Sequence, residues 1–417
     1  MAGRAFPAVC RGCGVIMKDC VTGLADLLSP QVVGMGGTAP LRLAIVGIGL
    51  IGRRHAAAIR QVDSAEICAI VDVDDGVLAT AESVGVRGFR DLTMMLESVR
   101  PDGIILSTPT NFHPAQGAAC IEAGIPVLIE KPIADDLQAA QMLVQTSDAC
   151  HVPVMVGHHR RFNPLIQRAK AALDSLEIGE IRTVDAKCWF YKPDDYFDNA
   201  PWRREKGAGP LSVNLIHDID LLRYLCGEIA AVQAQLSPSA RGYVIEDVAA
   251  AIFHFDNGAI GTISVSDSAV SPWSWEFTAA ENPVYPVTGE SAYQIAGSCG
   301  ALSIPDLTMW RHDGRPDWWA PLSSTKLSTE LSDPLVNQMT HFCAVIRGEI
   351  SPLVSACEGM KTLAVVAAIR EAAATGRPVR PTELLAAGGA GNAENMNFNI
   401  DSCDSFVDES AWNKTAP

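Results

Sequence analysis

The sequence lacks an apolar run long enough to cross a membrane, and it lacks a cysteine framework. Its 12 cysteines are scattered without regular spacing, which predicts free thiols in a reducing, cytoplasmic compartment. Basic residues are also scarce, because 32 Lys and Arg stand against 48 Asp and Glu, for a net charge of -16. Phosphate contacts require basic patches, so we expect no nucleic acid and no membrane among the partners.

Both ends of the chain lack a sustained hydrophobic period. Residues 1–40 predict a poorly ordered extension without the core of a signal peptide, although few acids there leave a transit peptide open. Cys10, Cys13 and Cys20 resemble half of a zinc site, but no second pair follows nearby, so we expect no metal. The Gly/Asn-rich residues 381–417 predict a disordered tail.

Short apolar segments alternate with helical patterns of about a dozen residues from residue 41 to residue 157. The segments are LRLAIVGIG, AEICAIVDVD, DGIILSTPT, PVLIEKP and VPVMVG. This alternation predicts βαβ units and a parallel sheet.

Residues 158–380 show a different pattern, in which strands of period two follow one another. These strands are IRTVDAKCWFY, VAAAIFHFDNG, AIGTISVSD and SAYQIAGS, and helices are expected near 163–175, 212–226, 335–347 and 356–375. The fold class is therefore α/β, with a second domain built on a mainly antiparallel sheet.

The segment VGIGLIG has the G-x-G-x-x-G spacing where a predicted strand ends and a helix begins. Gly47 would form the tight turn, Gly49 would admit a pyrophosphate, and Gly52 would let helix and strand pack closely, with Leu50 and Ile51 between them. An ordinary glycine-rich turn is the alternative.

Asp72 follows Gly52 by twenty residues and ends the next predicted strand, where a carboxylate binds ribose hydroxyls. Asp74 and Asp75 follow it without an adjacent Arg or Lys, so a 2′-phosphate would be repelled. We therefore expect NAD as the cofactor, with NADP less favoured. A simple turn cap is the alternative for Asp72.

Three polar segments follow other strands of the predicted parallel sheet: STPTNFH, EKP and GHHRRFNP. Ligands of open α/β sheets bind at the carboxyl ends of the strands, so we expect the three segments to share one crevice. The expected cofactor contacts there are Thr108, Pro109, Asn111, His113, Glu130, Lys131 and His158.

Taken with GIGLIGRRH, IVDVD and GAGPLSVNLIHDID, these segments make residues 41–380 resemble the Gfo/Idh/MocA family of oxidoreductases. The resemblance implies a Rossmann domain followed by an open-faced α/β domain that often mediates oligomerisation, so we expect a homo-oligomer, a dimer or tetramer. It also implies hydride exchange between NAD(P) and a carbinol carbon, often of a sugar or cyclitol.

The resemblance further implies that Lys131 and His217 are catalytic. Many members carry an aspartate four residues before that histidine, where this chain has Val213. On a helix, Asn214 stands three residues before His217 and could face the same site, although an amide cannot relay a proton. A satisfied core histidine is the structural alternative for His217.

Charge suggests how these residues would act. Hydride leaves a carbinol carbon only as the hydroxyl proton is lost, and a neutral histidine is a suitable base near neutral pH. A cationic lysine stabilises the developing alkoxide. The hypothesis is that His217 accepts the proton and Lys131 polarises the oxygen.

Candidate substrate contacts are Asn214, Arg160, Trp202, Arg203, Asp218 and Tyr191. Arg160 or Arg203 could hold a carboxylate as a bidentate pair, so a quinate- or shikimate-like ring acid stands beside sugars and cyclitols. The sequence is also compatible with a reductase of an imine or enone-like bond and with a non-catalytic dinucleotide-binding regulator. Trp318 and Trp319 suggest a packing or subunit contact.

Overall fold

The computed structural model describes residues 23–29 and 39–389, and these fall into two compact units. The first, here called the Rossmann unit, contains Leu24–Asn163, Ser332–Ala367 and the helix at Pro381–Gly389. The second unit contains Pro164–Leu331 and Ala368–Val379. The division at Asn163 lies six residues from the expected boundary, but the sequence analysis had assigned 332–367 to the second domain.

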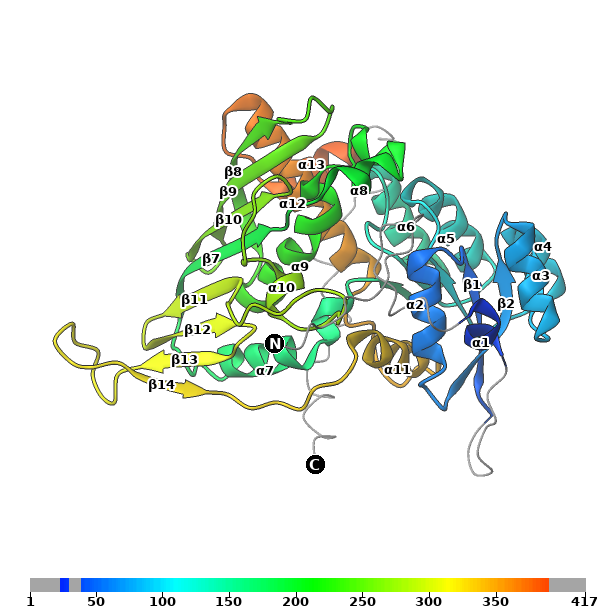
Figure 1. The fold of residues 1–417 in the computed structure, drawn as a ribbon, viewed down its shortest axis with the longest axis horizontal. Helices are drawn as coiled ribbons and strands as arrows, with labels where there is room; N and C mark the ends of the chain where they lie inside the picture. Colours follow the sequence, from blue (N-terminus) through cyan, green and yellow to red (C-terminus); the bar gives the residue numbers. More distant parts are fainter. Residues whose placement is uncertain (1–22, 30–38, 390–417) are drawn as a thin grey trace, which may run out of the picture. The chain divides into compact units, whose positions relative to one another are not determined.

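Six parallel strands form the sheet of the Rossmann unit, in the order β3-β2-β1-β4-β5-β6 (Figure 1). They are β1 (Leu41–Val46), β2 (Ala65–Val71), β3 (Arg87–Phe89), β4 (Gly103–Leu106), β5 (Val127–Ile129) and β6 (Val154–Val156). Every residue of β4, β5 and β6 is buried, which explains their continuous apolar sequence. The strand order reverses between β1 and β4, which is where such sheets bind their ligands.

The helices of this unit are α1 (Leu24–Leu28), α2 (Leu50–Ile59), α3 (Asp75–Ser83), α4 (Leu92–Ser98), α5 (His113–Glu122), α6 (Leu137–Cys150), α11 (Pro334–Ile346) and α13 (Pro381–Gly389). Within the unit, α11 packs against α2, and α13 packs against α6. The strand β3 and the helix α4 were not predicted from the sequence. The helix α1 lies in the segment that was expected to be a poorly ordered extension, and α13 lies in the expected tail. Residues 1–22, 30–38 and 390–417 of these two segments lie outside the described residues.

Eight strands form the sheet of the second unit, in the order β14-β13-β12-β11-β7-β10-β9-β8. They are β7 (Ile181–Trp189), β8 (Ile229–Pro238), β9 (Glu246–Phe255), β10 (Ile260–Ser266), β11 (Tyr293–Gly297), β12 (Gly300–Ile304), β13 (Thr308–Arg311) and β14 (Ser323–Lys326). Neighbours are antiparallel except β7 and β10, so the prediction of a mainly antiparallel sheet is confirmed. The sequence analysis had not identified β8, β12, β13 and β14.

One face of this sheet carries helices, and α7 (Pro164–Asp174) and α9 (Ile216–Cys226) pack against β12, β7 and each other (Figure 1). The remaining helices of this unit are α8 (Asp194–Asp198) and α10 (Trp275–Thr278). The division between the units falls within α12 (Ala356–Thr375), after Ala367. Burial alternates along β9, as expected for a sheet with one covered and one open face. Ile252 and Ile260 belong to the exposed set of β9 and β10.

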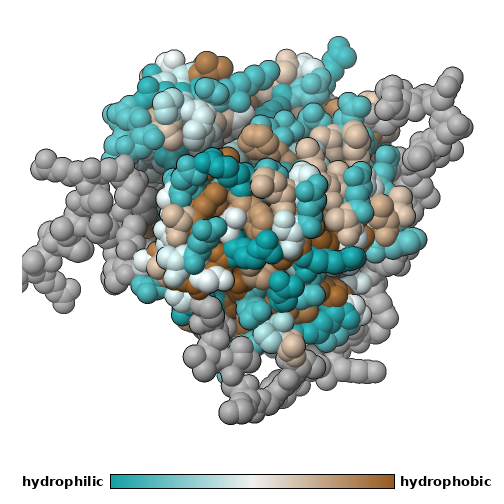
Figure 2. Space-filling model, turned by 90° about the vertical axis from the view of Figure 1, so that its right-hand side faces the viewer, coloured by the Kyte–Doolittle hydropathy of each residue, from teal (hydrophilic) through white to brown (hydrophobic). Residues whose placement is uncertain are grey.

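Figure 2 shows the face on which α3 and α4 lie, where hydrophilic residues are interspersed with small hydrophobic areas. Among the described residues, no helix combines the length and apolar character that a membrane span requires.

Candidate functional site

The glycine-rich turn after β1 requires glycine at two of its positions, as the dinucleotide-binding pattern predicts. Gly47 has φ +86, and a Cβ there would lie 2.9 Å from the carbonyl oxygen of Ser107, which follows β4. A Cβ on Gly52 would lie 2.1 Å from the carbonyl oxygen of Gly47, so only glycine lets α2 start this close to the turn. Gly49 is the N-cap of α2 and has no atom within 4 Å of its Cβ position, so the chain leaves open space there.

The side chains beside this turn lie at the surface or form hydrogen bonds with the turn itself. Leu50 is 60% exposed and Ile51 is 37% exposed in the first turn of α2. The Ser107 hydroxyl donates to the Gly47 carbonyl at 2.6 Å and so ties the ends of β1 and β4 together. Asp72 follows β2, and its Oδ2 accepts the backbone N–H of Ile48 at 2.8 Å. Asp72 therefore shapes the glycine turn, and the ribose contact stays a prediction for the same carboxylate.

Arg90 is a neighbour of this region that the sequence analysis did not find. It follows β3, and its guanidinium pairs with the carboxylate of Asp75 on the surface. The ion pair between Arg90 and Asp75 could not be predicted, because the two residues are not adjacent in the sequence and β3, which positions Arg90, was not predicted.

A Gly47→Ala variant tests the cradle. We expect NADH affinity to fall about tenfold or more, because a positive φ costs a residue with a Cβ about 1–2 kcal/mol and the Cβ also meets Ser107. Gly124→Ala is the matched control, since Gly124 has φ +73 but no neighbour within 4 Å of the Cβ position. Titration of NADH fluorescence measures both, and equal affinity in the two variants would contradict the assignment.

Lys131 follows β5 at the carboxyl edge that also carries the glycine turn, with β4 between β1 and β5. Its side chain is partly buried, and its backbone N–H donates to Glu130 Oε2 at 3.2 Å. Glu130 is 8% exposed, and its Oε1 lies 2.8 Å from His55 Nε2 of α2. Burial alone would raise the pKa of Glu130, but the hydrogen bond and charge of His55, with the charges of Lys131 and His159, lower that pKa to about 2.

In the segment after β4, two of the expected cofactor contacts, Thr108 and His113, form hydrogen bonds within the protein. Pro109 and Asn111 are exposed, whereas Thr108 Oγ1 donates to Gln116 Oε1 at 2.6 Å. His113 is 1% exposed, and its ring nitrogens lie 2.9 Å from the carbonyl oxygens of Pro132 and Thr108. Burial lowers the pKa of His113 despite these two carbonyls. His113 therefore braces this segment, and its predicted contact with the cofactor stays a prediction.

His158 and Arg160 follow β6 and are also buried, at 1% and 4% exposure. Arg160 belongs to the short 3-10 helix His159–Phe162. Their predicted contacts with cofactor and substrate stay predictions.

In the second unit, His217 lies in the first turn of α9 and is 8% exposed. Its neighbour Asp218 is fully buried, and the hydroxyl of Tyr293 on β11 donates to its carboxylate. Tyr293 in turn stacks on Trp275 at 6.0 Å between ring centroids. Through this contact Asp218 anchors α9 to the sheet, and its predicted contact with the substrate stays a prediction.

The turn before α9 is a π-helix, Leu211–Leu215, where the sequence analysis expected an α-helix from 212. Asn214 was expected to face the same site as His217 because residues three apart share a face of an α-helix. That premise is wrong here, because Asn214 lies in the π-helix. Asn214 Oδ1 is nevertheless buried without a hydrogen-bond partner among the described residues. A π-turn frequently marks a functional site, so Asn214 stays a candidate substrate contact.

The remaining predicted contacts lie between β7 and α9. Tyr191 is 42% exposed and Trp202 is 54% exposed. The Arg203 guanidinium lies 4.0 Å from the ring centroid of Tyr196 and 5.6 Å from that of Trp202. The Arg203 guanidinium thus lies against two aromatic rings, on the segment between β7 and α9 that carries the candidate substrate contacts.

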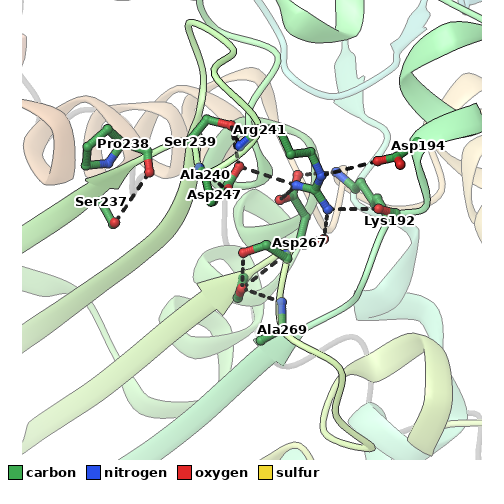
Figure 3. Close-up of polar contacts among 12 residues, drawn as sticks. Lys192, Asp194, Ser237, Pro238, Ser239, Ala240, Arg241, Asp247, Asp267 and Ala269 are labelled. Carbon is green, nitrogen blue, oxygen red and sulfur yellow. Dashed lines mark hydrogen bonds and ion pairs between the residues drawn. The ribbon is translucent and has the colours of Figure 1, made fainter.

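A buried charge network anchors this segment (Figure 3). Arg241 Nη1 lies 3.0 Å from Asp267 Oδ1 and 3.3 Å from Asp247 Oδ1, and Arg241 Nη2 donates to the carbonyl oxygen of Lys192 at 2.9 Å. Lys192 Nζ lies 3.8 Å from Asp267 Oδ2. Burial lowers the pKa of Lys192, and burial also raises the pKa of Asp267 against the charges of Lys192 and Arg241. The network therefore joins the ends of β7 and β10 to the loop after β8.

Arg241→Leu should destabilise the protein by about 3–5 kcal/mol, because it leaves two buried carboxylates without their main cation. Arg182→Ala is the control, since Arg182 and Glu180 form a pair in which both side chains are more than 60% exposed. We expect that control to change stability by less than about 0.5 kcal/mol. Chemical denaturation measures both, and similar losses would contradict the role of the network.

Comparisons with known proteins agree with this arrangement. A family model described as "Oxidoreductase family, NAD-binding Rossmann fold" matches residues 41–158. A second model, the GFO/IDH/MocA C-terminal domain, matches residues 166–303. Together they cover more than half of the chain.

Three similar proteins illustrate the relationship. D-apiose dehydrogenase of Paraburkholderia graminis is 27% identical over 85% of this chain and 94% of its own length. Myo-inositol 2-dehydrogenase of Thermotoga maritima is 28% identical over 55% of this chain and 70% of its own length. The crystal structure of the WlbA dehydrogenase of Bordetella pertussis, with NADH and UDP-GlcNAcA, has a TM-score of 0.67 at 26% identity and covers 82% of this chain and 98% of that chain.

Proposed function

Because the chain belongs to the GFO/IDH/MocA family of oxidoreductases, with an NAD-binding Rossmann domain, we propose that it is an NAD-dependent dehydrogenase of a polyhydroxylated ring. The substrate class is a sugar, a cyclitol or a related compound, and the reaction moves a hydride between a carbinol carbon and the nicotinamide. Relatives named as apiose and inositol dehydrogenases support this class.

The observation that carries the proposal is the placement of Lys131. It follows β5 at the same carboxyl edge as the glycine turn after β1 and Ser107 after β4. A cofactor held by that turn lies at the edge that also carries the ammonium. NAD supplies the hydride acceptor when it is bound.

The roles of the side chains follow from charge. His217 accepts the hydroxyl proton of the substrate, and the Lys131 ammonium stabilises the oxygen as negative charge develops on it. Asn214 Oδ1 accepts a hydrogen bond from another hydroxyl of the ring. Val213 cannot exchange a proton, so the proton passes through His217 without a carboxylate at that position.

A ring acid is the second candidate substrate, of the quinate or shikimate kind. Arg203 favours it, because its guanidinium carries a positive charge on this segment: Nη1 donates to the carbonyl oxygen of Tyr196 at 2.6 Å, and Nη2 could donate to a carboxylate. An absorbance screen for NADH over cyclitols, aldoses, sugar acids and shikimate-type acids tests both candidates. Production of NADH from neutral rings alone would reject the ring acid, and no NADH from any of them would favour a non-catalytic regulator.

The proposal includes a homo-oligomer in the cytoplasm. The open face of the second sheet exposes Ile252 at 40% and Ile260 at 47%, which supports contact with a second copy. Sedimentation velocity distinguishes a monomer from a dimer or tetramer. Eight free cysteines in the described part of the chain support a reducing compartment.

A further inference from the structure

Two buried histidines contact the residues on both sides of Lys131, one through a side chain and one through a backbone carbonyl. On one side, His55 Nε2 of α2 lies 2.8 Å from Glu130 Oε1. On the other side, His113 Nδ1 of α5 lies 2.9 Å from the carbonyl oxygen of Pro132. Both imidazoles are at most 1% exposed, so neither is accessible to bulk solvent.

The carboxylate of Glu130 is fixed from three directions. His55 holds Oε1, and the backbone N–H of Lys131 donates to Oε2 at 3.2 Å. Gly157, which follows β6, leaves the space that the carboxylate fills, because a Cβ there would lie 2.7 Å from Oε1. The low pKa of Glu130, about 2, keeps the group anionic near neutral pH. The carboxylate thus links three elements of the Rossmann unit at the residue before Lys131.

We propose that His55, Glu130 and His113 form a positioning clamp for Lys131, and that the rate of hydride transfer depends on this clamp. The inference rests on the proposed function, since it requires that Lys131 acts on the substrate. None of the three is a catalytic residue, because each acts on the lysine through the backbone of Lys131 or Pro132. Small displacements of a placed group reduce rates strongly, so a loosened clamp should lower kcat in an otherwise folded enzyme.

The first test compares two substitutions of His55. In His55→Leu the donor to Glu130 is lost, whereas His55→Gln keeps an N–H near the position of Nε2. We expect kcat to fall about tenfold to a hundredfold in the leucine variant, with KM for NAD changed less than about twofold. The glutamine variant should recover most of that kcat.

The second test leaves every polar group in place. Gly157→Ala adds a methyl group against the Glu130 carboxylate and should lower kcat about tenfold. Gly314→Ala is the control, because no atom lies within 4 Å of its Cβ position and its φ is not in the left-handed region. If His55→Leu does not fold, Gly157→Ala carries the test by itself.

Two results would overturn the clamp. One is wild-type kcat in both His55→Leu and Gly157→Ala. The other is a loss of kcat that follows the loss of thermal stability and is not recovered in His55→Gln. Failure of the proposed function is distinct, because then the wild-type enzyme would already produce no NADH from any substrate of the panel.

Discussion

Lys131→Met should lower kcat by about a hundredfold to a thousandfold while the enzyme still binds NADH. Methionine has a similar length but carries no charge, so the developing alkoxide loses its electrostatic stabilisation. The glycine turn and Asp72 are untouched, which is why binding of the dinucleotide should survive. Steady-state kinetics and NADH titration measure the two effects separately.

Lys326→Met is the matched control for this experiment. Lys326 lies at the end of β14 and is exposed, so the same change there should leave kcat within experimental error. Turnover retained in Lys131→Met would contradict the assignment of the lysine. Loss of both turnover and NADH binding would show instead that the substitution disrupts the cofactor site.

His217→Asn should lower kcat by about a hundredfold to ten-thousandfold, because asparagine cannot accept the substrate proton at neutral pH. The amide still fills most of the space of the imidazole, so the first turn of α9 should keep its packing. The anchor from Asp218 to Tyr293 also remains. Circular dichroism and thermal denaturation should therefore match the wild type.

His254→Asn provides the comparison within the same unit. His254 lies on β9 and is partly exposed, and we expect no change in kcat when it is replaced. If His217→Asn and His254→Asn behave alike, His217 is a core histidine and the proton leaves by another route.

The glycine turn and Lys131 could be predicted because their positions depend on local features of the sequence. Gly47 and Gly52 reflect steric limits that neighbouring residues impose, and Gly49 leaves the open space between them. Lys131 follows a continuous apolar strand, and parallel strands place their ends at one edge. The strand β3 was missed because only Phe89 of its three residues is buried, so it lacks the apolar run that marks β5 and β6.

The partners of Glu130 and Asp218 could not be predicted, because both depend on long-range packing. Glu130 and His55 are separated by 75 residues, as are Asp218 and Tyr293. Asp218 was expected to contact the substrate, but the sheet supplies a tyrosine hydroxyl that lets its carboxylate be buried. The same limit applies to Arg241, whose carboxylate partners come from β9 and the residue after β10.

Transfer of deuterium from a substrate labelled at the carbinol carbon to NAD tests the central claim most directly. We predict deuterated NADH, detected by mass spectrometry, with wild-type enzyme and a substrate from the polyhydroxylated panel, and a rate reduced by orders of magnitude with Lys131→Met. Undeuterated NADH would place the hydride donor at another carbon. NADH binding without any transfer from the panel would contradict the account and indicate a dinucleotide-binding protein without dehydrogenase activity.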